Sequence, residues 1–247
     1  MPIISIVNQK GGTGKTTTSM NLGSALAKLG KRVLVIDMDS QGNLGYSLGL
    51  DPGQTISDVF EGNATIRDII QEREGMQIAP SDMRLVDIEL SLIDLDDRHE
   101  TLSSKIGTLS KSYDYILIDC PPSLSILAVN SLYASDQVII PMLMEVLSLQ
   151  GLDQIINTIQ KINSSYDKKL EVMGILPVMV DKRRKLSEEV RDYINENYDV
   201  KIFNSMIRNN VKASEAPSFG QSVIEYSPSS NSAKDYMAFA EEIVKLN

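Results

Sequence analysis

The sequence predicts an α/β fold in which a mostly parallel, twisted sheet is covered by helices on both faces. Short runs of β-branched and apolar residues recur along the chain, and stretches with helical periodicity separate them. The runs are almost continuously hydrophobic, as are strands buried on both faces of a parallel sheet. The expected strands are residues 3–8, 32–37, 76–79, 115–119, 137–142 and 172–180.

Helices are expected between these strands. Residues 16–29 place Met20, Leu22 and Leu26 mostly on one face. Gly30 follows, and a glycine in the left-handed conformation commonly ends a helix. The other expected helices are residues 65–71, 82–95, 186–196 and 232–246.

Composition limits the class of protein. The 247 residues are 42% hydrophobic and 23% charged, and no linker or repeat interrupts them, so we expect one domain over residues 1–247. The net charge of −9 argues against a wholly basic surface but permits a local basic patch. Cys120 is the single cysteine, which favours a reducing cytoplasmic compartment. Apolar runs such as residues 138–144 are too short to span a membrane, and the chain opens on a strand rather than a basic leader.

A glycine-rich loop follows the first expected strand and opens the first expected helix. Glycines let successive backbone amides wrap around phosphates, and the helix N-terminus adds its positive dipole. In such a P-loop, Lys15 reaches the β- and γ-phosphates and the Thr16 hydroxyl binds Mg²⁺. Gln9 occupies the first glycine position of the ordinary pattern, whereas the compact form K-G-G-x-G-K-[ST] fits throughout. The expected nucleotide-binding residues are Lys10, Gly11, Gly12, Thr13, Gly14, Lys15, Thr16 and Thr17.

Aspartates follow two other expected strands. The carboxyl ends of parallel strands meet at one edge of the sheet, so Asp39 and Asp119 are expected beside the phosphates. We assign Asp39 to the positioning of the attacking water or to the Mg²⁺ shell. Asp119 ends an apolar strand, as in a Walker B motif, and would support Mg²⁺. Asp37 is open to two interpretations, as an outer carboxylate of this site or as a structural one. His99 is expected to be a solvated surface residue.

Lys10 makes the loop unusual, because the ordinary motif has no lysine before its glycine pair. With it, the sequence resembles the deviant-Walker ATPases, the family that includes ParA/Soj DNA-partitioning ATPases, MinD and the nitrogenase iron protein. In that family the early lysine reaches the partner's ATP in a nucleotide-sandwich dimer. The resemblance therefore implies catalytic roles for Lys10, Lys15 and Asp39, the cofactors ATP and Mg²⁺, and an ATP-dependent homodimer.

Two further segments resemble the ParA/Soj branch. The ParA/Soj switch usually reads D-x-D-P-Q-G-N, and residues 37–43 match it except that Ser40 replaces the proline. Residues 207–217 resemble I-P-R-N-V-R-L-S-E-A-P, with Lys212 at the second arginine. In ParA/Soj proteins basic residues of the C-terminal regions bind DNA non-specifically, which implies DNA contacts for Arg208 and Lys212. A second candidate patch, which can equally be a solvated turn, is Lys182, Arg183, Arg184 and Lys185.

The resemblance implies a nucleoid-associated switch for plasmid or chromosome partitioning. Its ATP dimer would bind double-stranded DNA, and a ParB-like centromere-binding partner would stimulate hydrolysis. No N-terminal helix-turn-helix is expected, because the chain starts at the first strand. The adenine base is expected near the loop after the strand 172–180 and the segment 203–217.

Other functions of the same fold are less consistent with the sequence. A MinD-like membrane switch needs a cationic amphipathic C-terminal tail, but the end of this chain carries Glu241 and Glu242. Electron transfer of the iron-protein kind needs bridging cysteines, which Cys120 alone does not supply. A scaffold with a degenerate ATP site is disfavoured because every expected catalytic position is filled. A metabolic kinase or synthetase is disfavoured by the DNA-type C-terminal segment.

Overall fold

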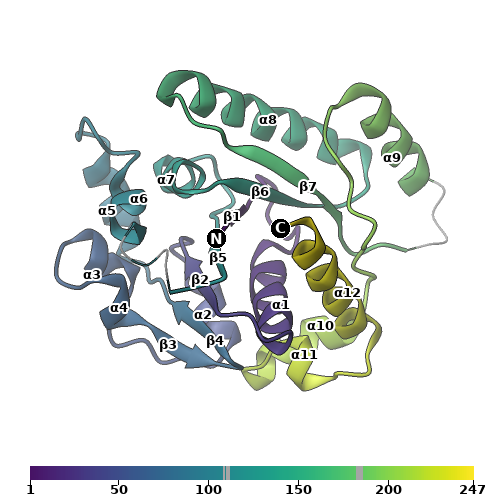
Figure 1. Ribbon diagram of the computed structural model, residues 1–247, viewed down its shortest axis with the longest axis horizontal. Coiled ribbons are helices and arrows are strands. Elements are labelled where there is room, and N and C mark those ends of the chain that lie inside the picture. Colours follow the sequence, from purple (N-terminus) through teal and green to yellow (C-terminus); the bar gives the residue numbers. More distant parts are fainter. Residues whose placement is uncertain (108, 110–111, 182–185) are drawn as a thin grey trace.

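One seven-stranded sheet holds every named strand of the computed structural model (Figure 1), which describes residues 1–107, 109, 112–181 and 186–247. The strand order is β3-β4-β2-β5-β1-β6-β7, and β3 is antiparallel to β4 whereas the other neighbours run parallel. The strands are β1 (Ile3–Ile6), β2 (Val33–Asp37), β3 (Gln71–Arg73), β4 (Met76–Ala79), β5 (Tyr115–Asp119), β6 (Gln137–Met142) and β7 (Glu171–Pro177).

Successive side chains of the central strands alternate between two apolar cores. On β2, Val33 and Val35 pack into one core, and Leu34 and Ile36 pack into the other. Strands buried on both faces in this way require continuous hydrophobic sequence, which is the pattern that predicted them. Figure 1 shows the resulting layers, with α7, α8 and α9 on one side of the sheet and α1 and α12 on the other.

The helices divide between these two cores. The first core, on the side of Val33, is covered by α1 (Lys15–Lys28), α2 (Asn43–Ser47), the 3₁₀ turn η1 (Ala216–Phe219), α11 (Val223–Tyr226) and α12 (Asn231–Leu246), with α10 (Val211–Glu215) beside them. The second core is covered by α3 (Ile56–Phe60), α4 (Ile66–Ile69), α5 (Leu85–Leu92), α6 (Thr101–Ile106), α7 (Ile126–Ala134), α8 (Val146–Tyr166) and α9 (Leu186–Asn197).

The predicted fold class is confirmed, and three strands have the predicted bounds, namely β4, β5 and β6. The expected helix 65–71 is wrong at its end, because α4 stops at Ile69 and residues 71–73 form β3. This strand was missed because it is short, polar and at the edge of the sheet. Glu74 and Gly75 both have positive φ, as the tight turn between β3 and β4 requires.

The expectation of a solvated His99 is also wrong. Its ring stacks on Tyr166 with centroids 3.9 Å apart and meets the edge of Tyr133 at 4.7 Å. The His99 side chain is 12% exposed. Aromatic stacking therefore holds this residue against α7 and α8.

The register of the central strands brings the site residues together. Asp119 is level with Ile6 on β1 and with Asp37 on β2. The loops that leave β1, β2 and β5 therefore start at one edge of the sheet. From β1 the chain crosses to β2 on one side of β1 in the sheet, whereas β6 lies on the other side of β1. Parallel α/β sheets bind ligands in the crevice at such a switch point.

Candidate functional site

The loop between β1 and α1 is an open cradle of backbone amides. Gly12 and Gly14 have φ of 73° and 77°, a conformation that favours glycine. A Cβ atom built on Gly11, Gly12 or Gly14 would meet no atom within 4 Å, so the space above the loop is open. Asn8 fixes the base of the loop, because its side chain accepts from the Lys10 amide at 3.0 Å and donates to the Pro141 carbonyl at 2.7 Å. This geometry suits an anion at the N-terminus of α1.

The two lysines of the loop lie in different surroundings. Lys15 is buried, and its Nζ donates to the Lys10 carbonyl at 3.4 Å. Burial lowers the pKa of Lys15, while the nearby Asp119 opposes this shift. The Lys10 side chain is half exposed, and its Nζ lies 3.7 Å from Glu145. Lys15 is therefore held at the cradle, whereas Lys10 extends towards the start of α8.

Asp37 holds the loop that carries Asp39. Its carboxylate is fully buried and accepts from the amides of Asp39 at 3.0 Å and Leu44 at 3.2 Å. Burial, followed by the charge of Asp119, raises the pKa of Asp37 well above its usual range. The Ser81 hydroxyl donates to the Asp39 carbonyl at 2.5 Å. Of the two interpretations left open for Asp37, these contacts favour the structural one.

Asp119 ends β5 and is hydrogen-bonded to α1. Its Oδ1 accepts from the Ser19 hydroxyl at 2.9 Å, whereas its Oδ2 is buried with no hydrogen-bond partner among the described residues. Burial raises the pKa of Asp119 to about 6. The charges of Asp39 and Lys15 are close enough to affect the Asp119 carboxylate. A buried carboxylate oxygen without a hydrogen-bond partner suits a hard cation such as Mg²⁺. The residues present therefore fit the expected metal, which Thr16, Asp39 and Asp119 would hold directly or through water.

One cavity of about 490 Å³ joins most of the predicted phosphate-site residues. The predicted residues that line it are Gly11, Gly12, Gly14, Lys15, Thr16, Thr17 and Asp39. Other residues of the lining include Gln41, Tyr46, Pro122 and Pro217. Lys10, Thr13 and Asp119 are not part of the lining, and the buried Thr13 donates to the Lys10 carbonyl instead.

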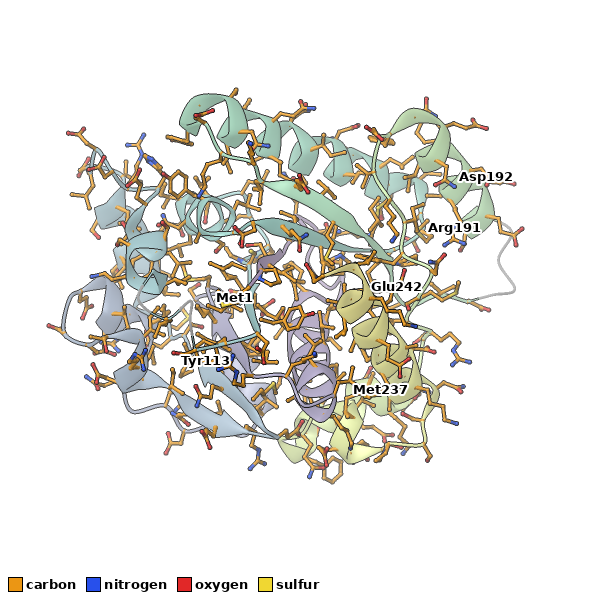
Figure 2. The ribbon with its side chains drawn as sticks, in the orientation of Figure 1. Met1, Tyr113, Arg191, Asp192, Met237 and Glu242 are labelled. Carbon is orange, nitrogen blue, oxygen red and sulfur yellow. The ribbon has the colours of Figure 1, made fainter. Side chains whose placement is uncertain are left out.

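The predicted DNA contacts lie in a separate segment that α12 anchors. Glu242, labelled on α12 in Figure 2, accepts from the amides of Asn204 and Ser205 at 3.0 and 2.8 Å. Arg208 forms an ion pair with Asp235 of α12, with Nη2 and Oδ1 2.6 Å apart. Lys212 pairs with Glu215 at 2.8 Å. The remaining predicted contacts, Lys182, Arg183, Arg184 and Lys185, lie outside the described residues.

The segments expected near the adenine base do lie together. The Val180 amide donates to the carbonyl of Ile207, and Val180 pairs with Arg208 as an isolated bridge. A cavity of about 460 Å³ opens here, lined by Val180, Asp181, residues 208–211 and Asn231. Pro217 of the same C-terminal region lines the cradle cavity, so this region contacts both hollows.

The sequence is similar to known partitioning proteins over nearly its full length. It is 40% identical over 246 residues to the sporulation initiation inhibitor protein Soj of Bacillus subtilis, covering 98% of this chain and 97% of Soj. It is 39% identical to the chromosome partitioning protein ParA of Caulobacter vibrioides, covering 98% and 93%. A family model described as an AAA domain matches residues 1–172. The chain belongs to the ParA/Soj family of ATPases.

Solved structures of nucleotide-bound proteins share the fold. The septum site-determining protein MinD of Pyrococcus horikoshii, complexed with Mg-ADP, is 30% identical with a TM-score of 0.83, covering 99% of this chain and 96% of MinD. Cobyrinic acid a,c-diamide synthase of Mycobacterium smegmatis, with bound ADP and magnesium, is 30% identical with a TM-score of 0.87, covering 99% and 94%. Both structures hold ADP and magnesium, which agrees with the expectation of ATP and Mg²⁺.

Three residues that position the site of this ParA/Soj-family chain were missed in the sequence. Asn8 braces the loop, Ser19 bonds Asp119 and Ser81 bonds the Asp39 backbone. Ser19 lies one helical turn after Lys15, so the spacing from the motif offers a signal for it. Ser81 follows β4 and is brought to Asp39 only by the pairing of β2 with β4.

Among the described residues, the helices are too short or too polar to span a membrane.

Proposed function

We propose that this ATPase is a partitioning switch, whose ATP-bound homodimer binds non-specific DNA and whose hydrolysis releases it. Residues 1–247 form one ATPase domain that acts on the nucleoid in the cytoplasm. The near-full-length similarity to ParA and Soj supports this role. The position of Lys10 is the observation that supports an ATP-dependent dimer. Its half-exposed side chain extends to Glu145, whereas Lys15 is held at the glycine loop of the same subunit.

Each residue of the site has a defined task in this proposal. The amides of the glycine loop and Lys15 bind the phosphates, and Thr16 and Asp119 support Mg²⁺, which neutralises charge on the phosphates when bound. Asp39 orients the attacking water. Lys10 reaches the nucleotide of the second subunit, so hydrolysis is completed only in the dimer. A ParB-like partner accelerates the step by ordering the loop that carries Asp39.

In the proposed dimer, DNA binding uses a small number of cations that the two-fold symmetry presents twice. Arg208 and Lys212 lie on the surface at and beside the 208–211 cavity, and a two-fold dimer presents each of them twice. Each cation that neutralises a phosphate releases condensed counterions, so a small patch suffices despite the net charge of −9. The adenine base is placed in the hollow between Val180 and residues 208–211, which couples nucleotide binding to the DNA segment.

The deciding experiment measures binding of Asp39→Ala to duplex DNA with ATP, with ADP and without nucleotide, at two salt concentrations. This variant should bind ATP and remain in the dimer, so DNA binding should appear only with ATP and weaken steeply as salt rises. Lys15→Ala is the control, and at an ATP concentration that saturates only the wild-type site it should show little DNA binding. If Asp39→Ala binds ATP but no DNA, the proposed DNA switch is wrong and the protein would next be tested on liposomes.

A further inference from the structure

Helix α5 is apolar on its outer face as well as its inner one. Leu85, Ile88 and Leu92 are buried in the core. A second row faces solvent. Two of its members, Val86 and Leu90, are four residues apart and lie on one side of α5, and the others lie in the segments that directly flank the helix. Elsewhere in the described ranges, exposed large apolar side chains occur in the sequence singly or as one pair. The outer row, here called the α5 stripe, is Met83, Val86, Leu90, Ile93 and Leu95, whose exposures range from 41% to 63%.

Along the sequence of the α5 stripe carboxylates outnumber cations, and the cations that flank it are Arg84 and Arg98. Residues 85–97 contain no lysine or arginine. Arg84 is held by Asp58 and Asp82, and Arg98 donates to the Ile93 carbonyl. In the part of the chain that the structure describes, the stripe carboxylates form no ion pair within 4 Å. They are Asp87, Glu89, Asp94, Asp96 and Asp97.

The stripe begins at the loop that carries Asp39. Met83 Sδ accepts from the Gln41 side chain at 3.7 Å, and Ser81 holds the Asp39 carbonyl. A Cβ atom on Gly42 would lie only 3.0 Å from the Ser81 carbonyl, so the two loops are in tight contact. A ligand that covers Met83 therefore contacts the hydrogen-bond partner of Gln41, and Gln41 is two residues from Asp39.

We propose that the α5 stripe docks a basic amphipathic helix of a partner protein, and that docking changes the hydrolysis rate through Met83 and Ser81. An apolar row with an acidic rim is complementary to a helix with one apolar face and flanking lysines or arginines. A second copy of the stripe would bring like charges together, and an anionic membrane surface would repel the same rim. In Figure 1, α5 lies at the periphery of the molecule and away from α12.

The binding test uses a labelled 14-residue peptide with leucines at i, i+3, i+4 and i+7 and lysines elsewhere. One control peptide has the same composition in scrambled order, and another has glutamate in place of lysine. The first peptide should bind at least about tenfold more tightly than either control. Leu90→Ser with Ile93→Ser should weaken it by about tenfold or more, because the binding surface loses two leucine-sized contacts. Leu246→Ser removes an exposed leucine of α12, on the other side of the sheet from α5, and should change nothing.

The coupling test measures phosphate release with and without this peptide. Bound peptide should change the rate of the wild-type protein by about twofold or more, and Ser81→Ala should bind peptide while losing that change. Binding that survives the double substitution, or that equals the scrambled control, would overturn the docking site. Sedimentation showing that the stripe mediates self-association would replace the partner with a second copy. An unchanged rate with peptide bound would overturn the link to Asp39. None of these outcomes depends on DNA binding.

Discussion

Lys10 lies in the glycine loop and Lys15 begins α1 five residues later, and their surroundings differ enough to separate their roles. Lys15 is buried at the cradle, so Lys15→Ala removes the cation expected on the phosphates. Charge-assisted hydrogen bonds contribute about 1.5–3 kcal/mol, so ATP affinity should fall by about 10–100-fold. Isothermal titration with ATP and Mg²⁺ measures the loss. Affinity equal to that of the wild type would contradict the phosphate site.

Lys10→Ala is the matched comparison for that measurement. The Lys10–Glu145 pair is half exposed and 3.7 Å long, so its loss should change the free energy of unfolding by less than about 1 kcal/mol. ATP affinity should stay near the wild-type value while hydrolysis falls, because the proposed contact is with the second subunit. Equal losses of ATP affinity in the two variants would remove the distinction between the lysines.

Asp119 gives the metal-free protein a pH-dependent stability. Its pKa is about 6 in the folded state, above the usual value of about 4 in an unfolded chain. The folded protein therefore holds a proton between these values that the unfolded chain releases. This contribution to stability is complete below pH 4 and is lost as pH rises through 6.

Asp119→Asn keeps the side chain neutral and removes this dependence. With EDTA at pH 8 the variant should be more stable than the wild type by on the order of 2 kcal/mol, and the difference should vanish near pH 4. Hydrolysis of ATP should be lost in the variant, since the amide is a poor Mg²⁺ ligand. Urea unfolding at both pH values measures the effect. A wild type that is the more stable protein at pH 8 would contradict it.

At the scale of elements, β7 and the segment that follows α9 depend on the absence of a side chain at Gly174. A Cβ atom there would lie 2.9 Å from the Phe203 ring and 3.1 Å from the Lys201 carbonyl. Gly174→Ala should therefore reduce the free energy of unfolding by about 1–3 kcal/mol through overpacking. Gly53→Ala, where a Cβ atom meets nothing within 4 Å, is the control for urea unfolding. Equal midpoints for the two variants would refute this packing.

Elements with a strong local signal were predictable, and those defined by long-range pairing were not. The buried strand β5 and the loop before α1 are defined by continuous apolar sequence and by fixed glycines, and both were found. The strand β3 is polar and exists because β4 pairs with it, so its three residues resembled a helix end. His99 lies in a charged run, and only the fold brings Tyr133 and Tyr166 around it. In the site, the motifs predicted Asp39 and Asp119, whereas Ser81 is brought to Asp39 only by the β2–β4 pairing.

At the scale of the whole molecule, the proposed DNA binding must use a small part of the surface, because the chain has a net charge of −9. In the structure the two described cations of that part, Arg208 and Lys212, are paired with carboxylates of the same chain. The partner of Arg208, Asp235, is largely buried, so Arg208→Ala would leave a carboxylate unpaired and affect stability as well as binding. Lys212 pairs on the surface with Glu215, three residues away, and offers the cleaner test.

Lys212→Ala should make DNA binding less dependent on salt concentration. The size of this change shows whether one or both subunits of the dimer contact DNA through Lys212. Each phosphate contact contributes about −0.9 to the slope of log K against log salt concentration, and a two-fold dimer presents Lys212 twice. The slope measured with ATP in the Asp39→Ala background should therefore become less steep by about 1.8 per dimer. Lys245→Ala removes an exposed lysine at the end of α12 and should leave the slope unchanged. A change of about 0.9 would mean that one subunit alone contacts DNA through Lys212, and no change would exclude Lys212 from the DNA surface.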